Sequence, residues 1–391
     1  MINLNDALEV ISNSVSRIMA SERIALPEIS GRILAEDIFS DMNFPSFDKS
    51  AMDGYAIKRA EIDDDLRVVE FIPAGKMPEL EVVDGCCSKI MTGAMIPKGA
   101  DMVVKVEDVL RHGDFIKVVQ TASKKNILFE GEDVKKGDLI LSKGRRLNSV
   151  HAGLLASVGA VKPLVYKKPL VSIISTGSEL VSPENFPGPS QIRNSNSSQL
   201  QVLAVESGTE VIEATQVDDN EQRIFNMVES ALAKSDIVVL TGGASVGDLD
   251  FTSRIFDGLK AVTHFTRLGI QPGKPVLFAT IGNKYLFGLS GNPVSSFVQF
   301  QLLLKPLIAR LSGNKEQDRI IKLPLSEEKT RKKAERQLFF PVIINDNMEV
   351  QSIEYHGSAH LNSYQSANAM ACFPIGVKIL KKGDLVDVRP L

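Results

Sequence analysis

This sequence has no large excess of charge of one sign, no long apolar run and few cysteines, and each of these features excludes a class of protein. The net charge over 391 residues is only −3, so no basic field favours nucleic acid as a partner. Three cysteines, two of them adjacent at Cys86 and Cys87, form neither an even disulfide framework nor a metal-ligand spacing, and a reducing cytoplasm fits. The most apolar predicted helix, residues 297–311, is interrupted by Lys305 and Pro306 and is too short to span a membrane.

Neither the N-terminus nor the histidines show a recognisable targeting or metal-binding motif. The chain starts without a basic segment followed by an apolar one, so we expect no secretory signal. Residues 5–19 instead predict a helix capped by Asn5. His356 and His360 have helical spacing, but Gly357 between them favours a loop over a metal site.

What the sequence does contain is enough apolar material for several domains. Hydrophobic residues make up 43% and charged residues 24%, which is ordinary for a globular protein. A chain of 391 residues is too long to fold around a single hydrophobic core. The pattern predicts a multidomain protein of class α/β plus β. Residues 1–41 and 134–167 form a discontinuous N-terminal linker domain with helical and β elements, 42–133 a β-rich insert domain, 168–312 an α/β domain, and 313–391 a C-terminal β-barrel domain.

Strand-like and helix-like segments alternate within the α/β domain. Strands are predicted over residues 170–175, 210–217, 236–240 and 285–289, and helices over 197–207, 221–234 and 294–311. This alternation predicts a central parallel sheet with covering helices. Such sheets bind ligands in the crevice beyond the carboxyl ends of their strands.

Glycines, hydroxyls and acids follow these predicted strands. The densest segment is TGGASVGDLD, residues 241–250, directly after an apolar strand, and shorter ones follow at 176–179, 218–219 and 290–293. Glycines at a strand end let backbone N–H groups approach an anion, and a nearby acid can hold a divalent cation. We therefore expect the segments to converge on one phosphate and metal site. Ordinary turns, with Asp218 and Asp250 capping the following helices, are the alternative.

A second dense segment lies in the insert domain at residues 44–56, FPSFDKSAMDGYA. Read from the residues alone, Asp53-Gly54 is a tight turn and Pro45 an extended lead-in. Together with the α/β domain, however, this segment resembles the molybdopterin molybdenumtransferase family, which includes the C-terminal domain of gephyrin. The resemblance runs in order through residues 47–55, 90–94, 126–133, 175–180, 242–250, 271–275 and 288–295.

This resemblance implies both an architecture and a reaction. The protein would be an elongated homodimer of four-domain subunits, and residues 168–312 would be its molybdopterin-binding domain. Its substrates would be adenylylated molybdopterin and molybdate, converted with the help of magnesium into molybdenum cofactor and AMP. The protein would act in the cytoplasm, with the adenylylating protein of the same pathway as a partner.

The resemblance also assigns roles to particular residues. Glu179, Asp218 and Asp250 would hold magnesium, which prefers hard carboxylate oxygens. Asp53 and Thr92 would reach the active site of the other subunit, and together with the three acids they form the expected catalytic set. The residues expected to bind substrate are Gly177, Gly242, Gly243, Ser245, Gly247, Lys274, Gly291, Asn292, Pro293, Ser295, Arg336 and Ser358.

Four of these residues suit molybdate, a tetrahedral dianion that needs cations, hydroxyls and N–H groups in place of its hydration shell. Lys274 follows a Pro-Gly turn, and Ser295 lies near the start of the helix predicted from Val294, where the helix dipole favours anions. Arg336 and Ser358 would close the pocket from the C-terminal domain. Without the resemblance they are interpreted as a surface arginine and a loop serine.

Three positions depart from the family pattern. Ser290 stands where a proline is usual, so its loop loses a rigid turn. Gln271 replaces a commonly basic residue, which predicts weaker molybdate affinity. Leu128 replaces an arginine, so that a pterin-phosphate or interface contact is missing or is supplied by Arg145 or Lys124.

These departures keep two alternatives to the transferase open. One is a non-catalytic protein of the same fold that binds molybdopterin or molybdate without turnover. The other is a nucleotide hydrolase that uses the same glycine-rich crevice. The three acids favour the enzyme, because none of the departures removes a carboxylate.

Overall fold

The computed structural model describes residues 1–120, 124–242, 249–316, 320–355, 357 and 360–391, although the side chains of residues 249 and 250 lie outside the description. The chain divides into two compact units. One comprises Met1–Glu36, Gly144–Asn148 and Lys162–Leu391, and the other Asp37–Lys143 and Ser149–Val161. The four domain boundaries expected from the sequence stay predictions.

The central sheet of the larger unit confirms the predicted parallel core. Its strands are β13 (Leu170–Thr176), β16 (Glu210–Val217), β17 (Ile237–Thr241), β18 (Val262–Arg267), β20 (Pro275–Ile281) and β21 (Lys284–Leu289). In space they lie in the order β16-β13-β17-β21-β20-β18. The first four are parallel. Strand β16 has the bounds that its β-rich pattern predicts.

Two antiparallel strands, β20 and β18, extend this sheet and were not predicted. Strands β20 and β21 form a hairpin, with Ile281 opposite Lys284 across the turn Gly282-Asn283. Gly282 has φ +54, the left-handed conformation that tight hairpins require. The tight turn returns the chain beside β21, so β20 extends the sheet without a crossover helix.

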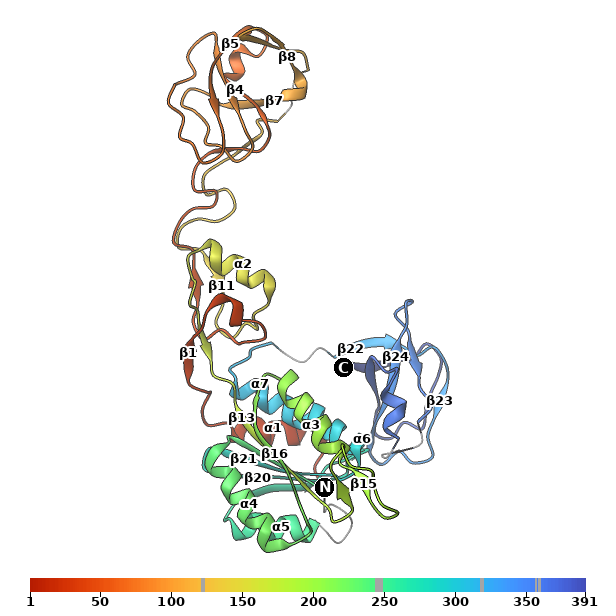
Figure 1. Cartoon of the computed structure of the whole chain (residues 1–391). Coiled ribbons are helices and arrows are strands. Elements are labelled where there is room, and N and C mark those ends of the chain that lie inside the picture. The colour runs from red at the N-terminus through yellow and green to blue at the C-terminus, as the bar shows by residue number, and fades with distance from the viewer. Residues whose placement is uncertain (121–123, 243–248, 317–319, 356, 358–359) are drawn as a thin grey trace. The chain divides into compact units, whose positions relative to one another are not determined.

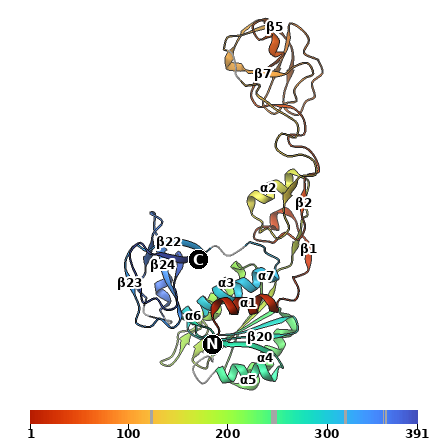
Figure 2. The ribbon, with the colours of Figure 1, turned by 180° about the vertical axis from the view of Figure 1, so that it is seen from behind.

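Helices cover both faces of the sheet, as Figure 1 shows. They are α1 (Leu4–Ser14), α3 (Ser195–Glu206), α4 (Glu221–Lys234), α5 (Leu249–Gly258), α6 (Pro293–Gln299), the π-helical segment η4 (Phe300–Leu304) and α7 (Lys305–Leu311). Alternate residues of one strand face opposite layers, because side chains alternate across a sheet. In β17, Val239 packs with α1, α3, α6 and α7, whereas Val238 packs with α4 and α5. The view from behind in Figure 2 shows α1 on the same face as α3 and α7.

The N-terminal helix is shorter than its sequence predicts, and Asn5 is not its cap. The side chain of Asn3 caps α1 by accepting a hydrogen bond from the N–H of Asp6 at 2.9 Å. After Ser14 the chain becomes extended, and the N–H of Met19 donates to the carbonyl of Leu311. This tertiary contact replaces the helical bond that the sequence pattern predicts for Met19.

The apolar helix predicted over residues 294–311 is present but not regular. Its middle, η4, is π-helical and ends at Leu304, two residues before Pro306. Proline has no N–H for the preceding turn, so a wider local turn there is an ordinary accommodation. No helix in the described ranges is both long and apolar enough to cross a membrane.

The C-terminal segment forms a largely antiparallel sheet around its own apolar core. Its strands are β22 (Ile321–Pro324), β24 (Gln337–Ile344), β25 (Val350–Ser352), β26 (Ala369–Phe373) and β28 (Leu385–Pro390), with the separate pair β23 (Lys329–Thr330) and β27 (Ile379–Leu380) and the 3₁₀ turn η5 (Leu361–Tyr364). Strand β19 (Ile270–Gln271) of the α/β segment joins this sheet, parallel to β24. The two segments therefore share one sheet edge.

The remaining elements of the larger unit are short. They are β1 (Ser21–Arg23) paired with β12 (Leu164–Tyr166), β14 (Leu180–Val181) paired with β15 (Ile192–Arg193), and the turn η1 (Leu26–Glu28).

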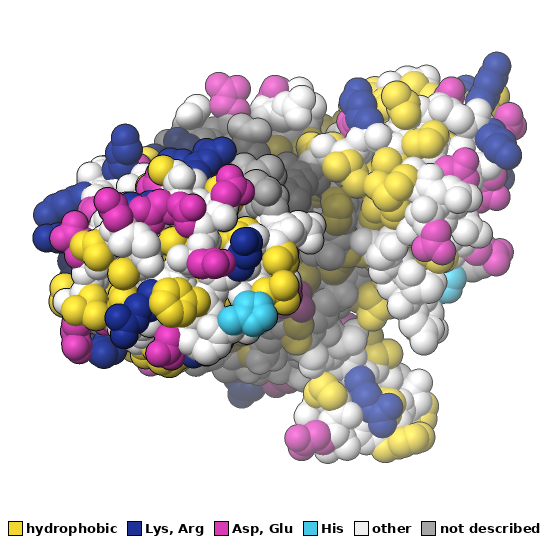
Figure 3. Space-filling view, turned by 90° about the horizontal axis from the view of Figure 1, so that it is seen from above, with side chains coloured by type: hydrophobic (Ala, Val, Ile, Leu, Met, Phe, Trp, Pro, Cys, Tyr) yellow, Lys and Arg dark blue, Asp and Glu magenta, His cyan; other side chains and the backbone are white. Residues whose placement is uncertain are grey.

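The smaller unit is β-rich, as predicted from its short alternating segments separated by Pro and Gly residues. It contains β2 (Ile38–Phe39), β3 (Lys49–Ser50), β4 (Gly54–Ile57), β5 (Asp65–Ile72), β6 (Cys86–Ile90), β7 (Met102–Lys105), β8 (Val109–His112), β9 (Phe115–Val118), β10 (Ile127–Leu128), β11 (Leu139–Leu141), the turns η2 (Arg59–Glu61) and η3 (Val106–Asp108), and helix α2 (Ser149–Ser157). The main sheet runs β7-β4-β6-β5-β9-β8. On the described surface in Figure 3, cationic and anionic side chains are interspersed, in keeping with the small net charge.

Candidate functional site at the carboxyl edge of the central sheet

The parallel register brings the predicted strand-end segments to one edge. Thr176 of β13 lies opposite Val217 of β16, and Thr241 of β17 lies opposite Leu289 of β21. Strands β13 and β17 are themselves neighbours. Residues 177–179, 218–219, 242 and 290–293 therefore all begin at the same edge, as the sequence predicts.

Glycines let these segments approach closely at the edge. Gly242 has φ +98, and a Cβ atom there would lie 2.0 Å from the carbonyl oxygen of Thr176. Such a distance is impossible without moving backbone, so only glycine fits. Gly291 lies next to Gly242, since a Cβ on Gly291 would be 3.4 Å from the Cα of Gly242. The ends of β13, β17 and β21 are thus in contact through glycine backbone.

Two of the three predicted metal ligands, Glu179 and Asp218, are described, and both are exposed. Their strand ends are adjacent, because the N–H of Gly177 donates to the carbonyl of Val217 at 3.4 Å. The carboxylate of Asp218 lies 3.3 Å from the guanidinium of Arg223. Within the described part of the chain, no three His, Cys, Asp or Glu side chains are grouped closely enough to hold a metal.

Asp250 is the second residue of helix α5, but its side chain lies outside the description, as do the predicted site residues Gly243, Ser245, Gly247 and Ser358. Their expected roles stay predictions.

The predicted molybdate residues Lys274 and Arg336 belong to segments that the structure brings together. Lys274 is exposed in the loop between β19 and β20. The guanidinium of Arg336 donates to the carbonyl of Ile270 at 3.2 Å, beside the pairing of β19 with β24. Ser295 lies in the first turn of α6 and is 3% exposed. Two cationic side chains from distant parts of the chain thus flank one loop.

The loop with Ser290, which lacks the proline of the family pattern, is held by several hydrogen bonds. The N–H of Ser290 donates to Oε1 of Gln299 at 3.0 Å, and its hydroxyl accepts from the N–H of Asn292 at 3.3 Å. Thr241 donates to the carbonyl of Ser290 at 3.1 Å, and Asn196 donates to that of Gly291 at 2.7 Å. Hydrogen bonds supply the rigidity that a proline ring would give.

Gln299 and Asn196 are structural members of the site that the sequence reasoning missed, and Thr241 lies in a predicted segment but had no role assigned to it. Gln299 is fully buried in α6, and its amide bonds two loops at once. A signal was present: this helix is otherwise strongly apolar, and a buried amide requires partners. Asn196 lies in a polar run that opens the helix after the metal-ligand segment, and that position also marks it as a residue of this edge.

Asp53 and Thr92 form a second predicted pair, within the smaller unit. Strands β4 and β6 pair Gly54 with Ile90, and this register brings the two residues together. One carboxylate oxygen of Asp53 accepts from both the hydroxyl and the N–H of Thr92, each at 2.7 Å. These bonds lower the pKa of Asp53, so the exposed side chain is anionic at neutral pH. Its predicted role in the active site of a partner subunit stays a prediction.

The position of the third departure, Leu128, is also described. Leu128 lies on β10 and is exposed. Arg145, one of its two suggested substitutes, forms an ion pair with Glu316 at 3.3 Å. Whether Arg145 or Lys124 supplies the missing contact stays a prediction.

Profiles of protein families match the chain in three consecutive parts. Residues 2–159 match the MoeA N-terminal region (domain I and II), 172–310 match the probable molybdopterin binding domain, and 325–391 match the MoeA C-terminal region (domain IV).

Similar proteins match over nearly their whole length. A molybdopterin molybdenumtransferase from Staphylococcus epidermidis is 34% identical, with 97% of this chain and 94% of that protein covered. One from Staphylococcus aureus strain COL is 35% identical, with 99% and 95% covered. The crystal structure of the molybdopterin biosynthesis moeA protein from Pyrococcus horikoshii OT3 matches all of both chains with a TM-score of 0.86 and 32% identity. Similarity of this extent in sequence and fold means that the chain belongs to the molybdopterin molybdenumtransferase family.

Proposed function

We propose that the protein transfers molybdenum: it inserts molybdate into adenylylated molybdopterin, with magnesium bound, and releases AMP. The observation that carries this proposal is the convergence of four parallel strand ends, with their glycines and carboxylates, at one edge. The relatives that are named molybdopterin molybdenumtransferase and match over nearly their whole length support the transfer of molybdenum.

The anion would bind between the two cationic residues described above. Lys274 Nζ has no hydrogen bond or ion pair with any described residue, and Arg336 has further N–H groups beyond the one that it donates to Ile270. Charged donors replace the hydration shell of a dianion better than neutral ones. The hydroxyl of Ser295, near the start of α6, would add a neutral donor.

The residues present fit magnesium by their chemistry. Glu179 and Asp218 offer carboxylate oxygens at adjacent strand ends, and their exposure suits an ion that keeps several water ligands. Asp250 would be the third ligand, and Arg223 would have to release Asp218. A bound magnesium ion would neutralise charge on the phosphoanhydride. In the net reaction, water adds its oxygen to phosphorus as the P–O bond of this group breaks and AMP leaves, while molybdate loses one oxygen as water when molybdenum binds the two sulfur atoms of the pterin.

Release of AMP tests this function directly. Purified protein incubated with adenylylated molybdopterin, molybdate and magnesium is expected to release AMP in step with cofactor formation. Tight pterin binding without AMP would instead support a binding or scaffold protein. AMP released from ordinary nucleotides in the absence of any pterin would support a nucleotide hydrolase.

We propose further that the active unit is a homodimer in which Asp53 and Thr92 serve the site of the partner subunit. Support comes from the fixed, exposed and anionic Asp53. Mixing the inactive variants Asp53→Ala and Glu179→Ala should restore about a quarter to a half of the activity, because mixed dimers contain one intact site. No restoration in mixed dimers isolated with two different tags would contradict shared sites.

Finally, we propose a cytoplasmic location and a transient contact with the adenylylating protein of the pathway. The scarcity of cysteine supports the location. Fractionation of cells and cross-linking of the two proteins would test these two points.

A further inference from the structure

One buried side chain, Gln299, connects the two loops that would hold molybdate. Gln299 is fully buried on α6. Its Nε2 donates to the carbonyl of Gly273 at 2.9 Å and to that of Pro275 at 2.6 Å. These carbonyls belong to the residues on either side of Lys274. Its Oε1 accepts from the N–H of Ser290 at 3.0 Å, so both N–H groups and the oxygen of the amide are engaged.

The stem of the same side chain fixes the shape of the lysine loop. Gly273 has φ +95, and a Cβ atom there would lie 2.9 Å from Cγ of Gln299. The loop therefore packs directly on the glutamine with no room for a side chain between them. On its other side, the carbonyl of Lys274 accepts from the N–H of Leu268 at 2.8 Å. The backbone of Lys274 is held from two sides, while its side chain is exposed.

Ser290 completes the connection. Its N–H is the donor to Gln299, and its hydroxyl accepts from the N–H of Asn292, just before α6 with Ser295 begins. A proline at position 290 has no N–H and would leave Oε1 of Gln299 buried without this partner. The backbone N–H of Ser290 is therefore needed to satisfy the buried amide oxygen of Gln299.

We propose that Gln299 is a positioning residue for molybdate: its amide sets the distance between the Lys274 loop and the Ser290–Ser295 segment, so that cation and hydroxyl face one anion. This inference rests on the proposed function. A binding group must be held within about 0.5 Å of its working position by a fixed supporting shell. Gln299 provides that shell without touching the substrate.

The test is the steady-state kinetics of Gln299→Met, which keeps the length of the side chain and removes all three hydrogen bonds. The KM for molybdate should rise at least about tenfold, while kcat and the KM for adenylylated molybdopterin stay within about twofold. Amide hydrogen exchange at Gly273 and Lys274 should also become faster. Gln301→Met, two residues further along the same helical run, is the matched control and should leave all three constants unchanged.

A second pair of variants keeps the test decisive if Gln299→Met does not fold. Ser290→Pro removes the hydroxyl and the N–H that donates to Gln299, and it also fixes φ at this position; it should raise the KM for molybdate about threefold or more. Ser290→Ala keeps the N–H and should have a smaller effect than Ser290→Pro. Equal values for the two Ser290 variants would contradict the role of this hydrogen bond.

Lys274→Ala separates failure of this inference from failure of the proposed function. If Lys274→Ala raises the KM for molybdate but folded Gln299→Met does not, Gln299 is merely structural and the inference is wrong. A lower kcat of Gln299→Met with unchanged KM values would contradict the inference in the same way. If Lys274→Ala itself leaves the KM for molybdate unchanged, molybdate does not bind at this loop, and the proposed site is wrong.

Discussion

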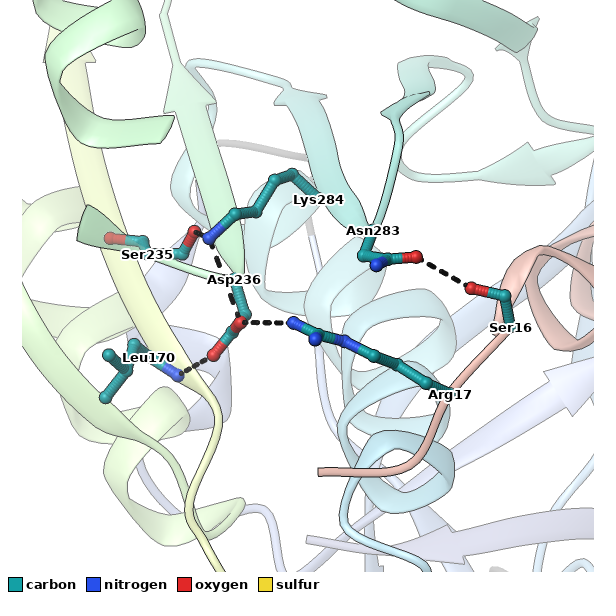
Figure 4. Close-up of polar contacts among 7 residues, drawn as sticks. All are labelled: Ser16, Arg17, Leu170, Ser235, Asp236, Asn283 and Lys284. Atoms are coloured by element: carbon teal, nitrogen blue, oxygen red, sulfur yellow. Dashed lines mark hydrogen bonds and ion pairs between the residues drawn. The ribbon is translucent and has the colours of Figure 1, made fainter. Parts of the chain in front are cut away.

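The two edges of the central sheet use carboxylates in opposite ways. At the amino edge, Asp236 precedes β17 and is 8% exposed. Its carboxylate accepts from the N–H of Leu170 at 3.0 Å and lies 4.0 Å from both Arg17 and Lys284, which Figure 4 shows converging on it. Lys284 in turn donates to the carbonyl of Ser235 at 2.7 Å. This acid is buried and surrounded by its own partners.

At the carboxyl edge, Glu179 and Asp218 are exposed, and Asp218 has only the exposed Arg223 as a charged partner among the described residues. Exposed pairs of this kind contribute little to stability. The contrast shows how to separate structural acids from candidate ligands in one sheet. An acid whose oxygens are already bonded has little capacity for a metal, whereas an exposed acid beside glycine turns retains it.

The strongest effect should be the loss of turnover on removal of an acid from the carboxyl edge. Glu179→Ala and Asp250→Ala should each lower AMP release about a thousandfold or more, because magnesium would lose a ligand. The melting temperature and the dimer should be preserved, since Glu179 is exposed and packs against no core. A variant that unfolds or dissociates would instead assign a structural role to that acid.

A smaller effect is expected from the glycines of the two edges, which share a left-handed backbone but differ in their surroundings. Gly242→Ala should lower the free energy of unfolding by about 3 kcal/mol or more, because the added Cβ would lie 2.0 Å from the carbonyl oxygen of Thr176. Gly282→Ala, in the hairpin at the amino edge with φ +54, meets no heavy atom within 4 Å and should cost only about 1 kcal/mol. Urea denaturation of both variants measures the difference. Equal losses would mean that the close approach at Gly242 is easily relieved.

Next in size is the loss of stability when the buried acid is removed. Asp236→Ala should lower the free energy of unfolding by about 2 to 3 kcal/mol, because it leaves the N–H of Leu170 without its acceptor and a half-buried Lys284 without its counter-ion. AMP release per folded molecule should be unchanged. The matched variant Asp219→Ala, at the exposed carboxyl edge, should cost less than about 1 kcal/mol. The reverse order would contradict the distinction between the edges.

The sequence revealed the carboxyl edge more readily than the amino edge, for a physical reason. Local periodicity and turn chemistry decide where strands and helices run, so β16 and α4 have their predicted bounds. The parallel order then brings the strand ends to one edge, so the segments that begin at this edge can be listed in advance. No local pattern tells which buried acid meets which cation across the fold, so the partners of Asp236 could not be predicted.

The same reasoning explains the omissions at the site itself. The hairpin between β20 and β21 depends on the tight turn Gly282-Asn283, and the prediction placed only one of these two strands. Gln299 stands in an apolar helical run, where its partners lie 24 to 26 residues earlier in the sequence and 9 residues earlier. Such connections depend on tertiary packing and follow only from the three-dimensional structure.

The weakest effect concerns Asp53, which combines features of both edges: it is exposed, yet it has a fixed partner. The hydroxyl of Thr92 is the main cause of its lowered pKa, and the N–H of Thr92 is the second. Thr92→Val removes the hydroxyl and keeps the N–H, so the pKa of Asp53 should rise toward its ordinary value of 3.8. Carboxyl titration by NMR measures this shift.

The sign of the accompanying stability change follows from the same bonds. Because the folded pKa of Asp53 is lowered, its anion stabilises the fold at pH values above about 4, and this contribution is lost as the pH falls through the folded pKa. Thr92→Val should therefore flatten the pH dependence of the free energy of unfolding below about pH 4 and leave its slope near neutral pH unchanged. Asp84, whose pKa is lowered by Lys58, provides the internal reference and should titrate as before. A shift in the pKa of Asp84 equal to that of Asp53 would mean that the substitution disturbs the whole smaller unit. The pKa of Asp53 could then not be attributed to its hydrogen bonds with Thr92.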